Sequence, residues 1–405
     1  MSNAIPNLRH LQIASEIARR GSISAAARAS HLSQPAVSQA IKALESLFGI
    51  SLFERTSVGM APTVAGRECL IRIDRALTQI AEAIAEVRRP KAGGRDDASY
   101  ATTSAQLQAL AAVVDQRGFS AAARMLKVSR ATLHRAARGL EQAIGTELFE
   151  KTSFGIGPTK EAEELARRLR LAFVEIDQAR AYVSALSGGS LGRTVIGAMP
   201  LARSMLVPVA VMAFAADYPQ HTVCILDGPY ESMLDALRHG SADVLIGALR
   251  DPVPHRDVIQ ETLFDDPLAI VVRAGHPLAR RKRASVRELA AFAWIAPRGG
   301  SPLRRQYDAL FRSASIDAPP GAIECNSLVA ARAILLASDR VMLLSARQVD
   351  HELMTGELTT LPHPLGPMFR SIGLTMRRDW RPTEAQHNLL ARLRATASAA
   401  PRKST

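Results

Sequence analysis

The strongest constraint on the fold of this chain is an internal repeat. Residues 24–63 recur without a gap at 120–159, an offset of 96, and from Leu11 and Leu107 onward 20 of 53 aligned positions are identical. The identities include both Ser-Ala-Ala-Ala-Arg blocks, both Leu-Glu pairs and both Leu-Phe-Glu triplets. Chance does not give such agreement, so the sequence predicts one supersecondary unit built twice in tandem.

The first unit opens with two predicted helices. Apolar residues at helical spacing from Leu8 to Ala18 predict a first helix with one buried face. Gly21 is expected to end that helix, because glycine tolerates the left-handed backbone at a helix terminus. Ser22 then offers a side-chain cap for a second helix over residues 25–30.

A third helix and a hairpin complete the unit. Ser33 is placed to cap the third helix, and an apolar stripe from Val37 through Leu44 points it toward the core. Two short strands, 51–56 and 60–63, are predicted to form a wing. This layout is typical of a winged helix-turn-helix whose third helix enters the DNA major groove. A generic three-helix protein-interaction domain stays open as the alternative.

Four motifs in this region resemble those of a known family. They are a Leu-x-x-Leu opening at 8–11, Ser-Gln-Pro-Ala-Val-Ser-Gln-Ala-Ile at 33–41, Leu-Phe-Glu-Arg at 52–55 and Pro-Thr-x-x-Gly at 62–66. Over about 60 residues the chain resembles the N-terminal domain of LysR-type transcriptional regulators. In that family the helix that carries Ser-Gln-Pro-Ala recognises the operator, the arginine after Leu-Phe-Glu sits in the wing, and a long helix behind the wing makes the dimer contact.

The resemblance implies a specific set of DNA-binding residues in the first unit. They are Ser33, Gln34, Pro35, Ala36, Ser38, Gln39 and Lys42 in the third helix and Arg55 in the wing. The dimer helix would be 64–88, where apolar residues recur independently at helical spacing. Because that stripe has no assigned partner inside the chain, a homodimer or homotetramer on double-stranded DNA is expected. RNA polymerase is a further partner that the resemblance admits.

The second unit departs from the family, whose members normally carry one such domain. Its predicted core matches that of the first unit, with Leu133, Ala137, Leu140, Ala143, Leu148 and Phe149 in place of Val37, Ile41, Leu44, Leu47, Leu52 and Phe53. Its outward face has changed to a more basic set, which gives a second group of candidate DNA-binding residues: Arg130, Thr132, His134, Arg135, Arg138 and Lys151.

Three interpretations of the second unit stay open. Arginine pairs with guanine or with phosphate, so this face could recognise a different half-site or strengthen non-specific binding. A degenerate copy retained for packing is the third. A second long helix, 160–186, follows this unit, and it could pair with helix 64–88 inside one chain and imitate a dimer.

The rest of the chain has the pattern of an α/β domain. Short apolar segments at 194–198, 222–226, 243–249 and 268–272 are predicted strands, and 201–215, 230–238, 303–314 and 328–337 are predicted helices. This alternation predicts parallel α/β units. The region from Arg193 also resembles the effector-binding half of LysR-type regulators, which implies two subdomains of periplasmic-binding-protein type.

The predicted fold class is therefore multidomain: two winged helix-turn-helix domains with long linker helices, then a two-subdomain α/β effector domain. The expected boundaries are 1–88, a linker at 89–103, 104–187, a hinge at 188–192, an effector domain at 193–397 and a disordered tail at 398–405. Within the effector domain, 193–265 and 368–397 would form the first subdomain and 266–367 the second.

Sheets of this kind bind ligands where the N-termini of helices converge outside the strand ends. Three such termini are predicted, and they supply the candidate effector-binding residues: Met199, Pro200, Arg203, Ser204, Gly300, Ser301, Asn326 and Ser327. Free backbone N–H groups favour an anion there, so a small carboxylate is the expected kind of effector.

Other function classes find less support in the composition. Three cysteines are too few and too dispersed for a metal knuckle, and Cys224 and Cys325 are expected to be buried, inert thiols. No metal-binding histidine motif or phosphate loop is present, so neither cofactor nor catalysis is expected. No apolar run suits a membrane span or signal peptide, which makes the cytoplasm the default. The net charge of +13 is spread along the chain.

The sequence therefore predicts a DNA-binding transcriptional regulator controlled by a small, anionic effector. The alternative is a ligand-independent architectural DNA-binding protein with an inert sensor domain. An enzyme is the third class, and only turnover of the bound metabolite would support it.

Overall fold

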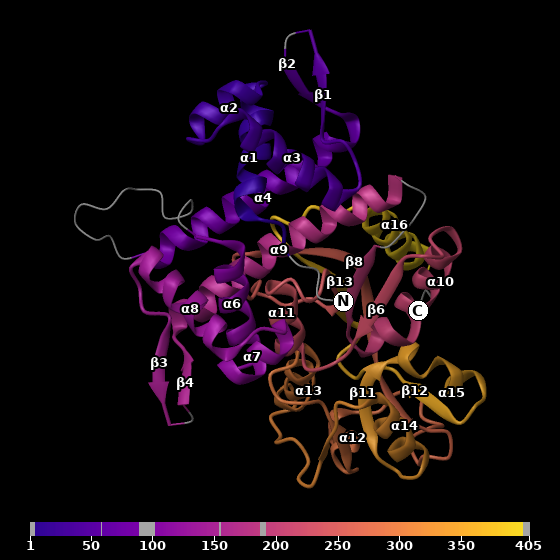
Figure 1. Ribbon diagram of the computed structural model, residues 1–405. Coiled ribbons are helices and arrows are strands. Elements are labelled where there is room, and N and C mark those ends of the chain that lie inside the picture. The colour runs from indigo at the N-terminus through magenta and orange to yellow at the C-terminus, as the bar shows by residue number, and fades with distance from the viewer. Residues whose placement is uncertain (1–4, 58, 89–101, 154, 187–191, 400–405) are drawn as a thin grey trace. The chain divides into compact units, whose positions relative to one another are not determined.

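A computed structural model describes residues 5–57, 59–88, 102–153, 155–186 and 192–399 of the chain (Figure 1). It contains two compact units, 1–193 and 194–405, and each is described by itself. Of the expected linker at 89–103, residues 89–101 lie outside the described residues, as does most of the expected hinge at 188–192. None of the described helices combines the length and the hydropathy needed to cross a bilayer.

Unit 1 consists of the two copies of the repeat, which are built from matching helices and strands. Copy 1 consists of α1 (Leu8–Arg20), α2 (Ile23–Ala29), α3 (Gln34–Phe48), β1 (Phe53–Thr56), β2 (Gly59–Pro62) and α4 (Val64–Val87). Copy 2 consists of α6 (Ser104–Asp115), α7 (Phe119–Leu126), α8 (Arg130–Ile144), β3 (Phe149–Thr152), β4 (Gly155–Pro158) and α9 (Lys160–Leu186). The predicted duplication is confirmed, because each element of copy 1 has a counterpart in copy 2.

The same residues fix the third helix in both copies. The Ser33 hydroxyl accepts a bond from the Ala36 N–H at 3.4 Å, and Ser129 caps α8 in the same way. Both helices end at a glycine in the left-handed region, Gly49 at φ 77° and Gly145 at φ 74°. The Ser33 cap predicted from the sequence is therefore present, and the equivalent cap in copy 2 sets where α8 begins.

The repeated Leu-Glu and Leu-Phe pairs have a structural explanation. Glu45 Oε1 accepts bonds from the N–H groups of Leu52, at 2.7 Å, and Phe53, at 3.3 Å. In copy 2, Glu141 accepts the two equivalent bonds at 2.9 and 3.1 Å. One carboxylate on the third helix thus holds the first strand of the wing, which explains why both motifs recur together.

The predicted core stripe of α3 is correct at three positions and wrong at one. Val37, Ile41 and Leu44 are buried, whereas Leu47 is 49% exposed. Phe48, 6% exposed, fills the core at the end of the helix instead. The apolar side chain of Leu47 therefore lies on the surface of copy 1.

The long helices α4 and α9 lie side by side in unit 1 (Figure 1). They run antiparallel, because Cys69 near the start of α4 meets the Ala179 carbonyl, at 3.8 Å, whereas Glu86 near its end meets Arg168. The premise that the apolar stripe of α4 has no internal partner is therefore wrong. Its partner is the equivalent helix of copy 2.

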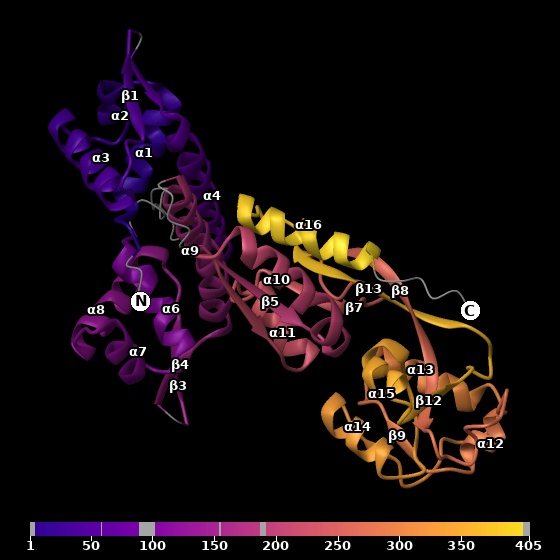
Figure 2. The same cartoon turned by 90° about the vertical axis from the view of Figure 1, so that its right-hand side faces the viewer.

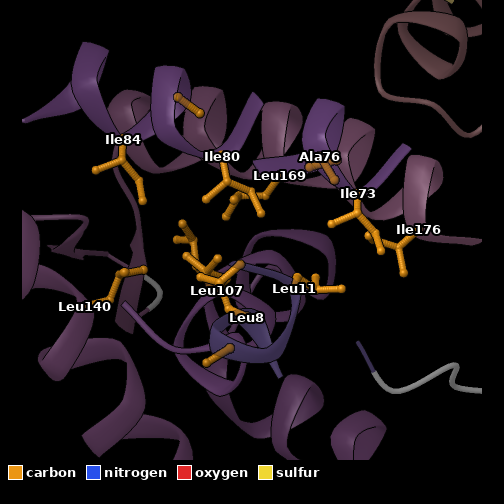
Figure 3. Close-up of a cluster of buried hydrophobic side chains, with 14 of the residues drawn as sticks. Leu8, Leu11, Ile73, Ala76, Ile80, Ile84, Leu107, Leu140, Leu169 and Ile176 are labelled. Carbon is orange, nitrogen blue, oxygen red and sulfur yellow. The ribbon is translucent and has the colours of Figure 1, made fainter. Parts of the chain in front are cut away.

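The two copies share one hydrophobic core. Figure 3 shows Leu8 and Leu11 of α1, Leu107 of α6, and facing side chains of α4 and α9 gathered in it. Ala76 at the middle of α4 and Ala172 at the middle of α9 are both fully buried. Small side chains at these positions let two helix backbones approach closely, so unit 1 packs as one body.

Unit 2 is built on one mixed sheet in the order β10-β9-β11-β8-β13-β7-β5-β6, with β12 also paired to β8. Its strands are β5 (Arg193–Ala198), β6 (Thr222–Leu226), β7 (Val244–Ala248), β8 (Val258–Arg273), β9 (Trp294–Ala296), β10 (Ile323–Glu324), β11 (Val341–Ser345), β12 (Leu358–Leu361) and β13 (Met368–Arg377). Its α-helices are α10 (Val207–Asp217), α11 (Tyr230–Arg238), α12 (Val286–Ala290), α13 (Pro302–Arg312), α14 (Leu328–Leu336), α15 (Asp350–Met354) and α16 (Glu384–Ala399). A π-helix, Ala202–Leu206, and a 3-10 helix, Ala346–Val349, complete the set.

The long strands β8 and β13 change the expected topology. They pair antiparallel along most of their length, and β13 also pairs antiparallel with β7. The prediction of parallel units holds for the β5–β7 pair and for β9–β11, but not for this central part of the sheet. The predicted strand at 268–272 is only the end of the 16-residue strand β8.

Separate hydrophobic cores lie toward the two ends of strand β8. One core is formed by the first and last parts of unit 2, from Ile196 and up to Ala397, and it includes residues of α10 and α16. Another is formed by the middle part, between Leu268 and Leu361 (Figure 2). Helix α16 ends at Ala399, so residues 398–399 belong to a helix rather than to the expected disordered tail. Residues 400–405 lie outside the described part of the chain.

Candidate functional sites

The outward face of α3 is polar and accessible. Gln34, Pro35, Gln39 and Lys42 are exposed, as is the capping residue Ser33, whereas Ala36 and Ser38 are half-buried. Both amide side chains are exposed, whereas Val37 and Ile41 between and beyond them are buried, so both amides point away from the buried stripe. Copy 1 therefore presents amide donors and acceptors, with one cation beside them.

Arg55 lies in the wing, which is fixed to the body of copy 1. Arg55 is exposed on β1 and is paired in register with Met60 of β2. The Met60 N–H donates to the Gly21 carbonyl at 2.8 Å, and a Cβ on Gly59 would meet the same oxygen at 2.3 Å. The wing thus approaches the end of α1 so closely that only glycine fits at position 59.

The outward face of α8 carries guanidinium groups. Arg130, Thr132 and Arg135 are exposed, as is Lys151 in the wing of copy 2. Arg138 is also exposed, but it donates to Glu141 Oε2 at 3.1 Å. Arg130 and Arg135 occupy the positions that Gln34 and Gln39 have in copy 1.

His134 differs from the other candidates on α8. Its ring stacks on Phe119 of α7, with centroids 4.0 Å apart and planes 5° from parallel. Partial burial, together with the charges of Arg130 and Arg138, lowers its pKa below 6.5. His134 is therefore a packing group, and the positive charge of this face comes mainly from the arginines.

Unit 2 contains a cavity of about 490 Å³ that collects most of the predicted effector residues. It is lined by Met199, Pro200, Arg203, Gly300, Ser301, Asn326 and Ser327 from the predicted set. Ser204 does not line it. Ser204 lies in the π-helix, and its hydroxyl donates instead to the Leu201 carbonyl at 3.0 Å.

Two predicted hydroxyl groups at the cavity already cap helices. Ser301 Oγ accepts from the Arg304 N–H at 3.1 Å, and Ser327 Oγ accepts from the Ala330 N–H at 3.3 Å. What these helices offer to a ligand is thus mainly backbone N–H groups and the positive end of the helix dipole. Cys325 also lines the cavity and is only half-buried, so the expectation of a buried thiol is wrong there.

The sequence prediction missed several charged and aromatic residues of the cavity. Arg250, Arg370, Asp227 and Tyr230 line it as well. The Arg250 guanidinium lies 3.9 Å from the centroid of the Tyr230 ring. They come from strand β13, the start of helix α11 and two loops, and no local motif marks them.

The two missed arginines are held differently. Arg370 donates to Asp266 Oδ2 and to Gln348 Oε1, both at 2.9 Å, and Asp266 is fully buried. Burial lowers the pKa of Arg250, and no described carboxylate forms an ion pair with it. The Tyr230 hydroxyl is buried without a hydrogen-bond partner among the described residues, and burial raises its pKa.

Comparisons with known proteins agree with this arrangement. A family model described as the LysR substrate binding domain matches residues 187–398. A second, described as the bacterial regulatory helix-turn-helix protein of the lysR family, matches twice, at 8–67 and 104–163. The second match coincides with copy 2, so the duplication is found at the level of the family motif as well.

Two curated relatives differ in how much of this chain they cover. The HTH-type transcriptional regulator GalR of Pseudomonas putida is 31% identical over 391 residues, which are 96% of this chain and 97% of that protein. The HTH-type transcriptional regulator PcaQ of Agrobacterium fabrum is 28% identical over 291 residues, 72% of this chain and 94% of that protein. GalR therefore has the length to hold both copies.

Solved structures show the same fold at lower identity. ArgP from Mycobacterium tuberculosis matches with a TM-score of 0.57 and 20% identity, covering 73% of this chain and 97% of that chain. A full-length OxyR variant from Pseudomonas aeruginosa matches with a TM-score of 0.54 and 22% identity, covering 73% and 94%. The two family models and the relative of matching length show that the chain belongs to the LysR family of DNA-binding transcriptional regulators.

Proposed function

We propose that this protein binds a specific operator through α3 and the wing of copy 1, and that a small anionic effector bound in unit 2 controls this binding. The observation that supports DNA recognition most directly is the exposed amide face of α3. Asparagine and glutamine pair bidentately with adenine in the major groove, whereas a cation on the wing binds phosphate on any sequence. Gln34 and Gln39 would supply specificity, and Lys42 and Arg55 would supply affinity.

A pair of substitutions separates these two contributions. Gln34→Ala is expected to weaken specific binding by about 1 to 3 kcal/mol and to leave binding to random DNA nearly unchanged. Arg55→Ala is expected to weaken both. Ser46→Ala, at an exposed position later in the same helix, is the matched control. Equal losses on specific and random DNA for Gln34→Ala would contradict this assignment.

The proposed effector is an anion because of the charges around the cavity in unit 2. Four arginines line it, namely Arg203, Arg250, Arg298 and Arg370, against the carboxylates of Asp227 and Glu231. Asp227 is paired with Arg203, and Arg370 is paired with Asp266. Arg250 thus has a charge available to a ligand, and Tyr230 beside it adds a buried hydroxyl. A carboxylate with an apolar body fits this combination.

Ligand-induced thermal stabilisation tests the cavity. A panel of small aliphatic and aromatic carboxylates is screened against the full chain, since a compound that binds only the native state raises its melting temperature. Arg250→Gln should remove the stabilisation by any active compound and preserve DNA binding in its absence. Arg280→Gln, an exposed position away from the cavity, is the charge-matched control. An undiminished response in Arg250→Gln would move the site elsewhere.

The expected homodimer or homotetramer would form through unit 2, because α4 is already occupied by α9. Helix α10 exposes two large apolar side chains, Val209 at 57% and Met212 at 73%. Strand β6 is the last strand of the sheet and exposes Ile225 at 45%. An apolar helix face beside an open strand edge suits a second copy of the chain. Met212→Asp should lower the mass measured by light scattering, and an unchanged mass would exclude this surface.

A further inference from the structure

The pairing of α4 with α9 contains a buried ionic cluster. Arg72, 2% exposed, donates to Glu175 Oε2 at 3.1 Å and to Gln178 Oε1. Arg75 reaches the other oxygen of Glu175 at 3.0 Å. A buried charge is retained only with a fitting partner, so this cluster fixes how the two helices align.

The cluster favours pairing of unlike copies. The repeat places Gln79 of α4 at the position of Glu175, and Leu171 of α9 at the position of Arg75. Two α4 helices paired with each other would set Arg75 against Gln79, and two α9 helices would set Leu171 against Glu175. The Arg75–Glu175 ion pair therefore forms only between copy 1 and copy 2.

A second contact between the copies also depends on a residue that only copy 2 contains. The Leu8 N–H donates to Ser104 Oγ, and that hydroxyl donates to the Pro6 carbonyl, both at 2.7 Å. Ser104 occupies in copy 2 the position of Leu8 in copy 1, so two copies of the first kind could not make these bonds. Elsewhere, Thr146 Oγ1 donates to the Val87 carbonyl at 2.7 Å. These bonds hold the two copies in one relative orientation.

In that orientation both recognition helices lie on one side of unit 1. Figure 2 shows α3 and α8 at the left edge of the unit, with α4 and α9 to their right. The outward faces differ in chemistry, because Gln34 and Gln39 of α3 correspond to Arg130 and Arg135 of α8. Amide side chains match adenine, whereas guanidinium groups match guanine or phosphate.

We propose that a single chain is a complete but asymmetric pair of DNA-binding copies, in which α3 and α8 recognise two dissimilar half-sites of one operator. This inference rests on the proposed function and adds the kind of operator to it. A homodimer of one copy requires two equal half-sites related by a two-fold axis. The unlike pair in this chain removes that requirement, and the basic face of α8 makes the second half-site different from the first.

Selection of bound sequences from a random pool of double-stranded DNA tests the proposal with the full chain. The wild-type chain should enrich a motif with two unlike halves. Gln39→Ala should relax the preference in one half only. Arg130→Gln together with Arg135→Gln, which copies the amides of α3 onto α8, should change only the other half toward the sequence of the first. Each lost base contact should lower affinity for the wild-type motif about 5- to 150-fold.

The controls separate a failure of this inference from a failure of the proposed function. His134 is left unchanged, because its ring packs on Phe119. A chain with Arg280→Gln and Arg283→Gln loses the same two charges in unit 2 and should enrich the wild-type motif. An inverted repeat, or a single half-site unaffected by the α8 substitutions, would overturn the inference and leave the proposed function standing. No enrichment of any sequence would overturn the proposed function itself.

Discussion

Glu175→Gln is the substitution that tests the internal structure of unit 1 most directly. Glu175 is 5% exposed and holds both Arg72 and Arg75. The amide has nearly the shape of the carboxylate, so the change removes charge while preserving packing. Breaking a buried ion pair from one side costs about 3 to 5 kcal/mol, because the remaining charge stays buried.

The expected cost lies at the lower end of that range. Glu68 on α4 remains 3.4 Å from Arg72 and is itself only partly exposed, so part of the charge stays compensated. A loss of about 3 kcal/mol in a unit of this size corresponds to a melting temperature lower by about 6 to 12 °C. Replacing Arg72 by Met and Glu175 by Leu together should restore most of the stability, because no charge is then buried.

The two units can be followed separately during unfolding. Both tryptophans of the chain, Trp294 and Trp380, lie in unit 2, so tryptophan fluorescence reports on that unit alone. Circular dichroism reports on the helices of both units. Glu175→Gln should therefore move a helical transition to lower temperature and leave the fluorescence transition in place.

Glu86→Gln is the matched control for this experiment. Glu86 pairs with Arg168 across the same two helices, but its side chain is 53% exposed, and such pairs contribute below about 1 kcal/mol. Equal shifts for the two variants would show that the Arg72–Glu175 cluster is not buried as described.

Three further predictions concern other contacts. Glu45→Ala should lower the stability of unit 1 by about 1 to 3 kcal/mol in thermal unfolding, because the N–H groups of Leu52 and Phe53 lose their acceptor; an unchanged transition would contradict this. Asp266→Asn should destabilise unit 2 by about 3 kcal/mol, seen in tryptophan fluorescence, because Arg370 loses its buried carboxylate, and equal stability would refute that role. Burial lowers the pKa of His221 below 6.5, so the unfolded chain binds more protons as the pH falls through that value, and unit 2 should lose stability there. His221→Asn should flatten this dependence, and an unchanged slope would assign it to other groups.

The repeat made unit 1 largely predictable, because the signals for the third helix and the wing were present twice. Ser33 and Ser129, the glycine ends and the core stripes agree between the copies, and the predicted elements follow the observed ones closely. What the sequence could not decide was the partner of α4. An apolar stripe shows that a helix packs against something, whereas the identity of the partner depends on contacts between residues about a hundred positions apart.

The errors in unit 2 have local causes. Residues 258–267 of β8 contain two short apolar pairs separated by runs of polar residues, and they include Pro267, so their central place in a sheet gave no continuous apolar signal. The π-helix directs the Ser204 hydroxyl to the Leu201 carbonyl. Arg250 and Tyr230 meet only in the folded chain, and neither belongs to a motif.

The contact between α4 and α9 also affects how the regulator responds to its own abundance. When two DNA-binding copies sit on separate chains, their pairing follows mass action, and dilution separates them. Covalently joined copies face each other at an effective concentration in the millimolar range for short flexible connections, whatever the concentration of the protein. The fraction of paired copies therefore stays constant from a cell with few chains to a cell with many, and the supply of paired copies rises in proportion to synthesis.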